Sequence, residues 1–289
     1  MIKVSIIVPT FNSSRYVTKL LETVPDCGCE VIIVDDYSED LLDLRRIVEH
    51  YKNVRLISNS SLKGAGTCRN IGIENAHGEY LVFADSDDYF DNDATQVFAD
   101  IEKYLPLNCD IAYFKPASTS LRGDISTRHE TYVGLVDLHL KQRLDYLKYW
   151  FHVPWSKIFR REFVIKNSFK FSDTLVSNDV IFSLNTGINA NSIISHDLSF
   201  YTVVERGGSL TRTTDFKKLL QRLTILREYN DILKKRGLQR YSIPEAIYLI
   251  RMFKLNPRKT LQVALTSHRF FPGRNYIISR ILIRTRTRK

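Results

Sequence analysis

Four apolar segments in the first 83 residues alternate with segments of helical periodicity, and this alternation restricts the fold more than any other feature of the sequence. In each apolar segment, successive positions are apolar rather than every second one, which is typical of strands buried on both faces. Such strands, separated by helices, predict an α/β fold with a mostly parallel sheet flanked by helices. The predicted strands are Val4–Val8, Glu30–Val34, Val54–Ile57 and Tyr80–Phe83.

The segments between these strands, and most of the chain beyond Asp110, predict further elements. Apolar residues at helical spacing predict helices over 13–24, 41–51 and 66–76. A longer helix is expected over 135–150 and strand structure over 192–204, and residues from Asp215 onward are expected to be helical with proline breaks.

Polar residues follow each predicted strand, where the chain leaves the sheet. Ligands of such sheets bind beyond the carboxyl ends of the strands, so these residues are expected to face one site. They are Pro9 to Asn12, Asp35 to Ser38, Asn59 to Gly66 and Asp85 to Asp88.

The acidic turn Asp85-Ser86-Asp87-Asp88 suits Mg²⁺ or Mn²⁺, which take carboxylate oxygens and complete their shell with water and substrate phosphate. Aspartate also favours turns and helix N-caps, and Asp88 and Asp91 are candidate caps for a helix from Asn92.

Two other groups fit a nucleotide. The Asp36 carboxylate can accept a hydrogen bond from a base or a ribose hydroxyl, although a polar loop residue is the alternative. Arg69, on a helix that follows small residues, can face a phosphate or be a surface cation. Together with the acidic turn, these groups predict a nucleotide-diphosphate site.

These residues, in this order and spacing, resemble the successive motifs of family 2 inverting glycosyltransferases of the GT-A fold. The resemblance covers roughly residues 1–212. It rests on Val4 to Asn12, Val34 to Ser38, Gly64 to Gly72, Gly78 to Asp88, Pro154 to Arg161, and Asn178-Asp179.

The resemblance implies a GT-A catalytic domain over 1–212, with a nucleotide-sugar half at 1–110 and an acceptor half at 111–212. A helical, basic C-terminal region would follow at 213–289. It also implies transfer of a hexose or N-acetylhexosamine from a UDP-sugar to a saccharide, such as a lipid-linked intermediate of surface polysaccharide.

The resemblance also assigns roles residue by residue. Asp36 would contact the uracil, which Pro9 and Phe11 would line. Asp85 and Asp87, with Ser86 between them, match the DxD motif, whose last acid holds the metal. Arg69 would lie near the nucleotide, and Arg206 would cover the diphosphate. Asp179 matches the catalytic base, which takes a proton from the acceptor hydroxyl, and a helix N-cap is the alternative.

The chain departs from the family at residue 178, where Asn178 stands in place of the usual Glu. The base position itself is retained, so the departure puts in doubt only the acceptor contacts of a second carboxylate.

The net charge of +10 comes from the C-terminal region alone. Residues 1–245 hold 31 of the 42 bases and all 32 acids, so 11 bases and no acid lie in residues 246–289. Residues 274–289 have a basic amphipathic pattern, with an apolar face that includes Tyr276. This tail is expected to hold the enzyme at an anionic membrane surface, and packing on the catalytic domain or on a second subunit of a homodimer is the alternative.

Location and metal sites can also be predicted. With no run of roughly 18 to 20 apolar residues and no signal peptide, the protein is expected in the cytoplasm, peripheral on the inner face of the plasma membrane. The four cysteines show no zinc-ligand spacing, Trp155 is expected to be a packing residue, and His152 and His196 are not assigned to a metal.

Two alternative functions are those of a sugar nucleotidyltransferase and of a nucleic-acid-binding protein. A sugar nucleotidyltransferase would be expected to have a glycine-rich basic loop after the first strand, where this chain has Pro9 to Asn12. A nucleic-acid-binding protein is disfavoured because acids line the presumed cleft. No nucleic-acid partner is expected.

Overall fold

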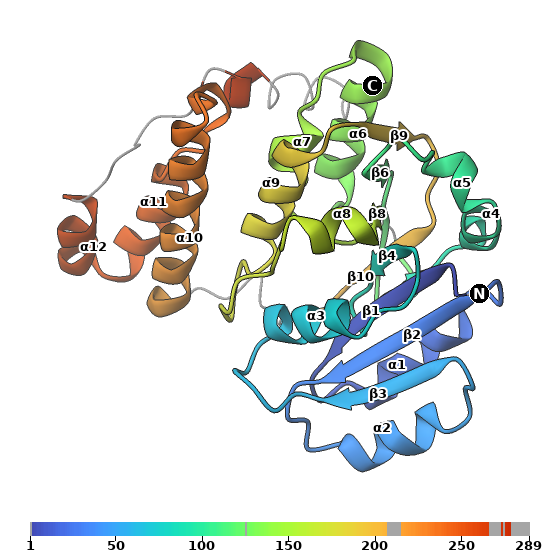
Figure 1. The fold of residues 1–289 in the computed structure, drawn as a ribbon. Coiled ribbons are helices and arrows are strands. Elements are labelled where there is room, and N and C mark those ends of the chain that lie inside the picture. Colours follow the sequence, from blue (N-terminus) through green and yellow to red (C-terminus); the bar gives the residue numbers. More distant parts are fainter. Residues whose placement is uncertain (1, 125, 207–214, 266–272, 274, 279–289) are drawn as a thin grey trace.

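A computed structural model describes residues 2–124, 126–206, 215–265, 273 and 275–278. The main sheet has seven strands in the order β3-β2-β1-β4-β8-β6-β9, and its first four strands are parallel, which confirms the predicted α/β fold (Figure 1). The bounds of these strands are β1 (Val4–Thr10), β2 (Cys29–Asp35), β3 (Val54–Ser58), β4 (Tyr80–Phe83), β6 (Ile111–Phe114), β8 (Lys157–Arg160) and β9 (Ile193–His196).

Two apolar cores cover the two faces of the main sheet, and β1 and β2 are therefore buried on both sides. On one face, Ile7, Ile32 and Val34 pack with Cys68 and Ile73 of the third helix. The other face packs against the first two helices. The helices that precede β6 are α1 (Ser14–Glu22), α2 (Leu41–Val48), α3 (Ala65–Glu74), α4 (Asp93–Ala99) and α5 (Ile101–Tyr104).

A second sheet lies beside the first and has the order β5-β10-β7. Its strands are β5 (Tyr89–Phe90), β7 (Ala117–Ser120) and β10 (Tyr201–Glu205). The strand structure predicted over 192–204 is confirmed, and it is divided between the two sheets. β9 joins the main sheet, and β10 joins the second sheet.

The prediction of a single helix over 135–150 is wrong. It is two helices, α6 (Glu130–Gln142) and α7 (Leu147–Trp150), separated by Arg143, which has a left-handed φ of 55°. Apolar residues on both sides of this break pack into the same core, so the hydrophobic pattern does not reveal the break. The helices that follow are α8 (Arg161–Lys166) and α9 (Val180–Asn189).

The C-terminal helical appendage is confirmed. It consists of α10 (Phe216–Lys235), the 3₁₀ turn η2 (Gln239–Tyr241), α11 (Ala246–Leu255) and α12 (Pro257–Ala264). Of the predicted amphipathic tail, only residues 275–278 are described, and Tyr276 lies edge-on to Trp150 with ring centroids 5.8 Å apart. Tyr276 thus packs against α7, and the rest of the tail lies outside the described residues. Within the described ranges, no helix is long and apolar enough to cross a bilayer.

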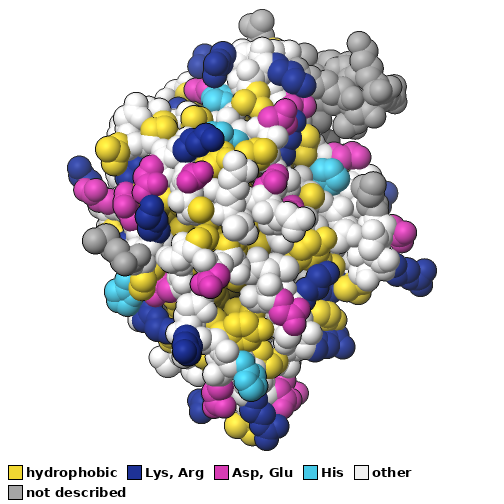
Figure 2. All heavy atoms as spheres, turned by 90° about the vertical axis from the view of Figure 1, so that its right-hand side faces the viewer, with side chains coloured by type: hydrophobic (Ala, Val, Ile, Leu, Met, Phe, Trp, Pro, Cys, Tyr) yellow, Lys and Arg dark blue, Asp and Glu magenta, His cyan; other side chains and the backbone are white. Residues whose placement is uncertain are grey.

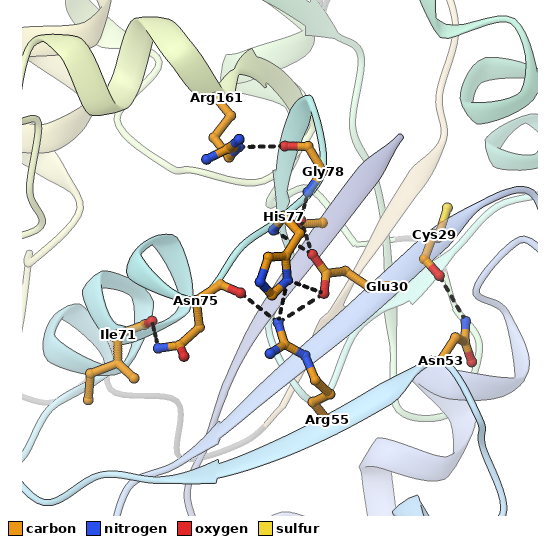
Figure 3. A network of polar contacts seen from close by, with 10 residues as sticks. Cys29, Glu30, Asn53, Arg55, Ile71, Asn75, His77, Gly78 and Arg161 are labelled. Atoms are coloured by element: carbon orange, nitrogen blue, oxygen red, sulfur yellow. Dashed lines mark hydrogen bonds and ion pairs between the residues drawn. The ribbon is translucent and has the colours of Figure 1, made fainter. Parts of the chain in front are cut away.

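An ionic network around the buried Glu30 carboxylate ties the strands together at the amino end of the sheet (Figure 3). The carboxylate of Glu30, on β2, accepts hydrogen bonds from Ser5 Oγ at 2.6 Å and from His77 N at 2.7 Å. Arg55 of β3 lies 2.9 Å from the same carboxylate and also donates to the Asn75 carbonyl. The network thus fixes β1, β2 and β3 at the edge opposite the predicted site.

Candidate active site

The acidic turn begins directly after β4 and is braced by β10. The Tyr201 hydroxyl accepts a hydrogen bond from Asp85 N at 2.8 Å and donates one to Asp88 Oδ2 at 2.7 Å. Val204 N donates to the other Asp88 oxygen at 2.8 Å. Burial, followed by the neighbouring Asp85 charge, raises the pKa of Asp88. Asp88 is therefore a buried support of the turn.

Neither Asp88 nor Asp91 caps the following helix, so that interpretation of the two residues is wrong. Helix α4 begins after Asn92, and the Asp91 carboxylate accepts hydrogen bonds from Ser199 and Thr202. Both aspartates are used by β10 or the residues just before it, more than 100 positions away, and no local pattern encodes such contacts.

Arg69 joins the acidic turn to the segment that carries the predicted base. Its guanidinium lies 2.6 Å from Asp85 Oδ1 and donates to Asn178 Oδ1 at 2.9 Å. The side chain is only 7% exposed, so Arg69 is not a surface cation. Its Nε is buried without a hydrogen-bond partner in the described part of the chain. Arg69 therefore holds a positive charge, with one unused donor, beside Asp85.

Glycine allows this close approach. A Cβ on Gly66, in the first turn of α3, would lie 2.2 Å from the Ser172 carbonyl oxygen and 2.9 Å from Asn178 Cβ. Helix α3 can therefore pack directly on the 172–178 segment, and this packing brings Arg69 to Asn178.

Arg206, the residue after β10, pairs with the second DxD acid. Its guanidinium lies 2.7 Å from Asp87 Oδ2 and 3.5 Å from the centre of the Tyr16 ring. Asp87 is about one-third exposed, and Arg206 Nε has no hydrogen-bond partner within the described ranges. The two carboxylates of the DxD motif thus each face one arginine.

Asp179 lies at the start of α9, next to Asn178. It occupies the N-cap position, as the alternative held, but its side chain makes no capping hydrogen bond to the helix. Burial raises its pKa, and the positive charge of Arg69 partly offsets this increase. A carboxylate with a raised pKa is a better proton acceptor than an exposed one. The side chain of Asn178 accepts a hydrogen bond from Arg69 and donates one to the Thr174 carbonyl.

The residues predicted to line the base lie at the ends of β1 and β2. Phe11 is 47% exposed and carries Lys63 Nζ 3.8 Å from its ring centre, whereas Pro9 is buried within β1. Asp36 is buried, and its Oδ1 accepts hydrogen bonds from Asn59 Nδ2 at 2.9 Å and Gly64 N at 3.0 Å. Asp36 therefore also holds the loop before α3.

Ser86 lies between the two DxD acids and is linked to the first strand. Its hydroxyl is 2.9 Å from Ser13 Oγ, which is 2.6 Å from Thr10 Oγ1. These hydroxyls join the acidic turn to the end of β1.

A buried lysine near Asp179 was not predicted from the sequence. Lys157 is fully buried on β8, and its Nζ donates to the Phe151 carbonyl at 2.6 Å. Burial lowers its pKa, and the Asp179 charge opposes this decrease. Its neighbours in residues 153–161 are aromatic and basic, so the sequence pattern does not show that Lys157 is buried. Trp155 is buried against Tyr132 and Tyr201, as expected of a packing residue.

The described residues around the acidic turn suit a diphosphate, and they offer only two carboxylates as ligands for a metal ion. Two arginines with unused buried Nε donors flank the turn, which suits an anion. Among the described residues, no three Asp, Glu, His or Cys side chains form a group able to hold a metal. Mg²⁺ and Mn²⁺ in nucleotide sites need only one or two protein carboxylates besides phosphate and water, so Asp87 and Asp85 meet that requirement.

A model of the family described as "Glycosyl transferase family 2" matches residues 5–167, more than half of the chain. The chain belongs to this family. The matched region holds the sheet strands β1 to β4, the acidic turn and Arg69. This membership confirms the resemblance drawn from the motifs.

Two of the relatives are named for glycosyl transfer to poly(ribitol phosphate). The chain is 31% identical over 220 residues to the poly(ribitol-phosphate) beta-N-acetylglucosaminyltransferase TarS of Staphylococcus aureus, covering 72% of this chain and 36% of TarS. It is 31% identical over 216 residues to a poly(ribitol-phosphate) beta-glucosyltransferase of Bacillus spizizenii, covering 71% of this chain and 33% of that enzyme. The chain thus spans about a third of the length of these relatives.

Solved structures share the fold. The S. aureus TarS 1-349 complex with UDP-GlcNAc superposes with a TM-score of 0.62 at 24% identity, covering 91% of this chain and 76% of that one. The mannosyltransferase PcManGT of Pyrobaculum calidifontis, in complex with GDP-Man and Mn²⁺, gives 0.59 at 14% identity, covering 99% and 79%. The GT-A architecture is therefore confirmed, with a sheet whose order places β1 between β2 and β4.

Proposed function

We propose that this glycosyltransferase moves N-acetylglucosamine or glucose from a UDP-sugar, with inversion, to a hydroxyl of a surface polymer. The observation that carries the proposal is the double contact of Arg69, which links the DxD turn to Asn178, next to Asp179. A diphosphate group beside Asp85 and a base on the acceptor side are thereby held at a fixed separation. The named relatives support the two sugars and a poly(ribitol phosphate) acceptor as the first to test.

The donor would bind along the carboxyl ends of β1, β2 and β4. Asp36 would accept a hydrogen bond from the uracil through its second oxygen, and Phe11 and Pro9 would line the base. Arg69 and Arg206 would donate to the diphosphate through their unused Nε groups. Asp87, with Asp85, would hold a Mn²⁺ or Mg²⁺ ion, whose charge would offset that of the departing UDP.

Asp179 would act as the general base. It would take the proton of the acceptor hydroxyl as that oxygen forms a bond to the anomeric carbon and the bond to UDP breaks on the opposite face. UDP-GlcNAc carries an α-linked sugar, so attack from the opposite face gives a β product. The names of both relatives specify β transfer, which supports inversion.

We also propose that the catalytic domain ends at residue 212. The enzyme would act at the inner face of the plasma membrane on a lipid-linked acceptor. A membrane-bound acceptor would make attachment of the enzyme to the bilayer useful, because the search for substrate becomes two-dimensional. A homodimer is the alternative use of the C-terminal region.

The decisive experiment measures UDP release from a panel of UDP-sugars, with and without poly(ribitol phosphate), in Mn²⁺ and after chelation. We expect transfer from UDP-GlcNAc or UDP-glucose, a β linkage in the product by NMR, and loss of activity on chelation. Asp173→Asn is the matched control for Asp179→Asn, because Asp173 is an exposed acid in the same segment. An α-linked product, or turnover with GDP-sugars only, would contradict the proposal.

A further inference from the structure

The outer face of α11 and α12 exposes apolar side chains that no described part of the chain covers. The inner faces of these helices are filled, because Leu249 and Met252 are buried against Leu219 and Leu223 of α10. The side chains concerned are each at least 46% exposed, and the last of them directly follows α12. They are Ile250, Phe253, Leu255, Leu261 and Leu265, and we call them the apolar patch.

The position of this patch is fixed by ionic contacts. Arg227 of α10 lies 2.8 Å from Glu245, just before α11, and donates to the Val263 carbonyl of α12 at 3.0 Å. One arginine thus holds all three helices together. The patch therefore lies on helices that are fixed relative to one another.

The charged residues of α11 and α12 are all basic. Residues 246–265 contain four bases and no acid, and all four are exposed: Arg251, Lys254, Arg258 and Lys259. On the face of the molecule seen in Figure 2, by contrast, acidic and basic side chains are interspersed. A second copy of this surface would bring like charges together across a two-fold axis, which disfavours self-association.

We propose that the outer face of α11 and α12 is a docking surface for an anionic lipid bilayer. Exposed apolar side chains flanked by bases, on a helix lying in the plane of the interface, bind membranes by shallow insertion and by attraction to anionic headgroups. In the view of Figure 1, strands β2 and β3 point toward the side of the molecule on which α10, α11 and α12 lie. Docking there would bring the carboxyl edge of the sheet toward the membrane.

The test is co-sedimentation of the full chain with vesicles of phosphatidylcholine alone or with 30% phosphatidylglycerol, at low and high salt. One variant removes apolar contacts (Ile250→Ser with Phe253→Ser), and a second neutralises the four bases to Gln. Matched controls are Leu42→Ser with Leu107→Ser, two exposed leucines elsewhere, and Arg45, Lys52, Lys103 and Lys166 changed to Gln.

We expect binding to anionic vesicles only, weakened by salt, and a partition coefficient at least about tenfold lower in both patch variants, since each base contributes about fivefold. The controls should bind like the wild type, and all variants should keep its thermal midpoint. Equal binding to neutral vesicles, or unchanged binding of either patch variant, would overturn the proposal. So would a dimer in gel filtration that the patch variants abolish, because the face would then be a subunit interface. No step of this test requires turnover, so its outcome is independent of the proposed activity.

Discussion

The Arg206 guanidinium lies 2.7 Å from the Asp87 carboxylate and stacks on Tyr16, so the acid expected to hold a metal is neutralised by a residue of the chain itself. A cation and Arg206 would therefore compete for the same oxygen. When a diphosphate is present, Arg206 has an alternative anion to which it can donate.

Replacement of Arg206 tests this competition. In Arg206→Ala, Mn²⁺ should bind more tightly in the absence of nucleotide, by about threefold or more, while the KM for the UDP-sugar rises. Free Mn²⁺ is measured by electron paramagnetic resonance, and Arg46→Ala serves as an exposed control. Unchanged Mn²⁺ affinity would show that Asp87 is not the metal ligand.

Asp87→Ala should abolish transfer and remove the metal dependence of UDP binding without unfolding the protein. The change deletes a hard oxygen ligand from a side chain that is already partly exposed, so little packing is lost. Calorimetric titration with UDP, with and without Mn²⁺, provides the measurement. Identical metal-dependent binding in wild type and variant would exclude the assignment.

Asp179→Asn should lower the transfer rate by about 10² or more and leave UDP affinity near that of the wild type. The base must be deprotonated, and burial raises its pKa. The rate should therefore fall as pH decreases through that raised pKa, at a higher pH than for an exposed aspartate. The pH profile of kcat gives the result. An equal loss of UDP affinity would instead make Asp179 a donor-site residue.

Asn178→Ala should weaken donor binding although residue 178 need not touch the donor. The substitution removes an acceptor from the buried Arg69 guanidinium, and a hydrogen bond to a charged group contributes about 1.5–3 kcal/mol. We expect a lower thermal midpoint and a higher KM for the UDP-sugar, with the pH profile unchanged. An unaltered KM would mean that Arg69 is positioned by Asp85 alone.

Glu30→Gln should destabilise the fold by about 2 kcal/mol at neutral pH, because it weakens bonds to a buried charged group. Burial raises the pKa of Glu30, but the hydrogen bonds from Ser5 and His77 and the Arg55 charge lower it further, so the net shift is downward. The ionised group therefore stabilises the protein above its ordinary pKa, and this contribution is lost as pH falls through the lowered value.

Urea unfolding at neutral and acid pH checks this prediction, with the exposed Glu22→Gln as control. The difference in unfolding free energy between wild type and Glu30→Gln should shrink as the pH falls. A difference independent of pH would show that the Glu30 charge does not contribute.

The sheet and the ligand-binding edge were predictable because their signals are local. Apolar residues at successive positions reveal strands buried on both faces, and acids placed directly after such strands must lie at the carboxyl edge. The order of the motifs was specific enough to predict the family. Arg69 was predicted near the nucleotide, but its burial and its bond to Asn178 depend on packing between segments about 110 residues apart.

Other features depend on contacts that a linear pattern does not contain. Asp88 has the same sequence context whether it caps a helix or supports a turn, and the Tyr201 hydroxyl decides between these roles. Lys157 lies in a basic, aromatic segment in which a buried lysine looks like an exposed one. The separation of β9 from β10 likewise depends on which sheet each strand joins. The break at Arg143 is hidden because apolar residues on both sides of it pack into one core.

The position of Arg206 directly after β10 has a kinetic consequence. The strand is paired on both edges, and through Tyr201 it is bonded to the same acidic turn that Arg206 contacts, so the backbone carrying this arginine is anchored. Transfer of the guanidinium from Asp87 to an incoming diphosphate then needs only side-chain rotation, which takes picoseconds to nanoseconds, rather than closure of a segment over microseconds to milliseconds. This movement of the Arg206 side chain should be much faster than turnover. Release of the product, rather than movement of Arg206, would therefore limit the rate of this step.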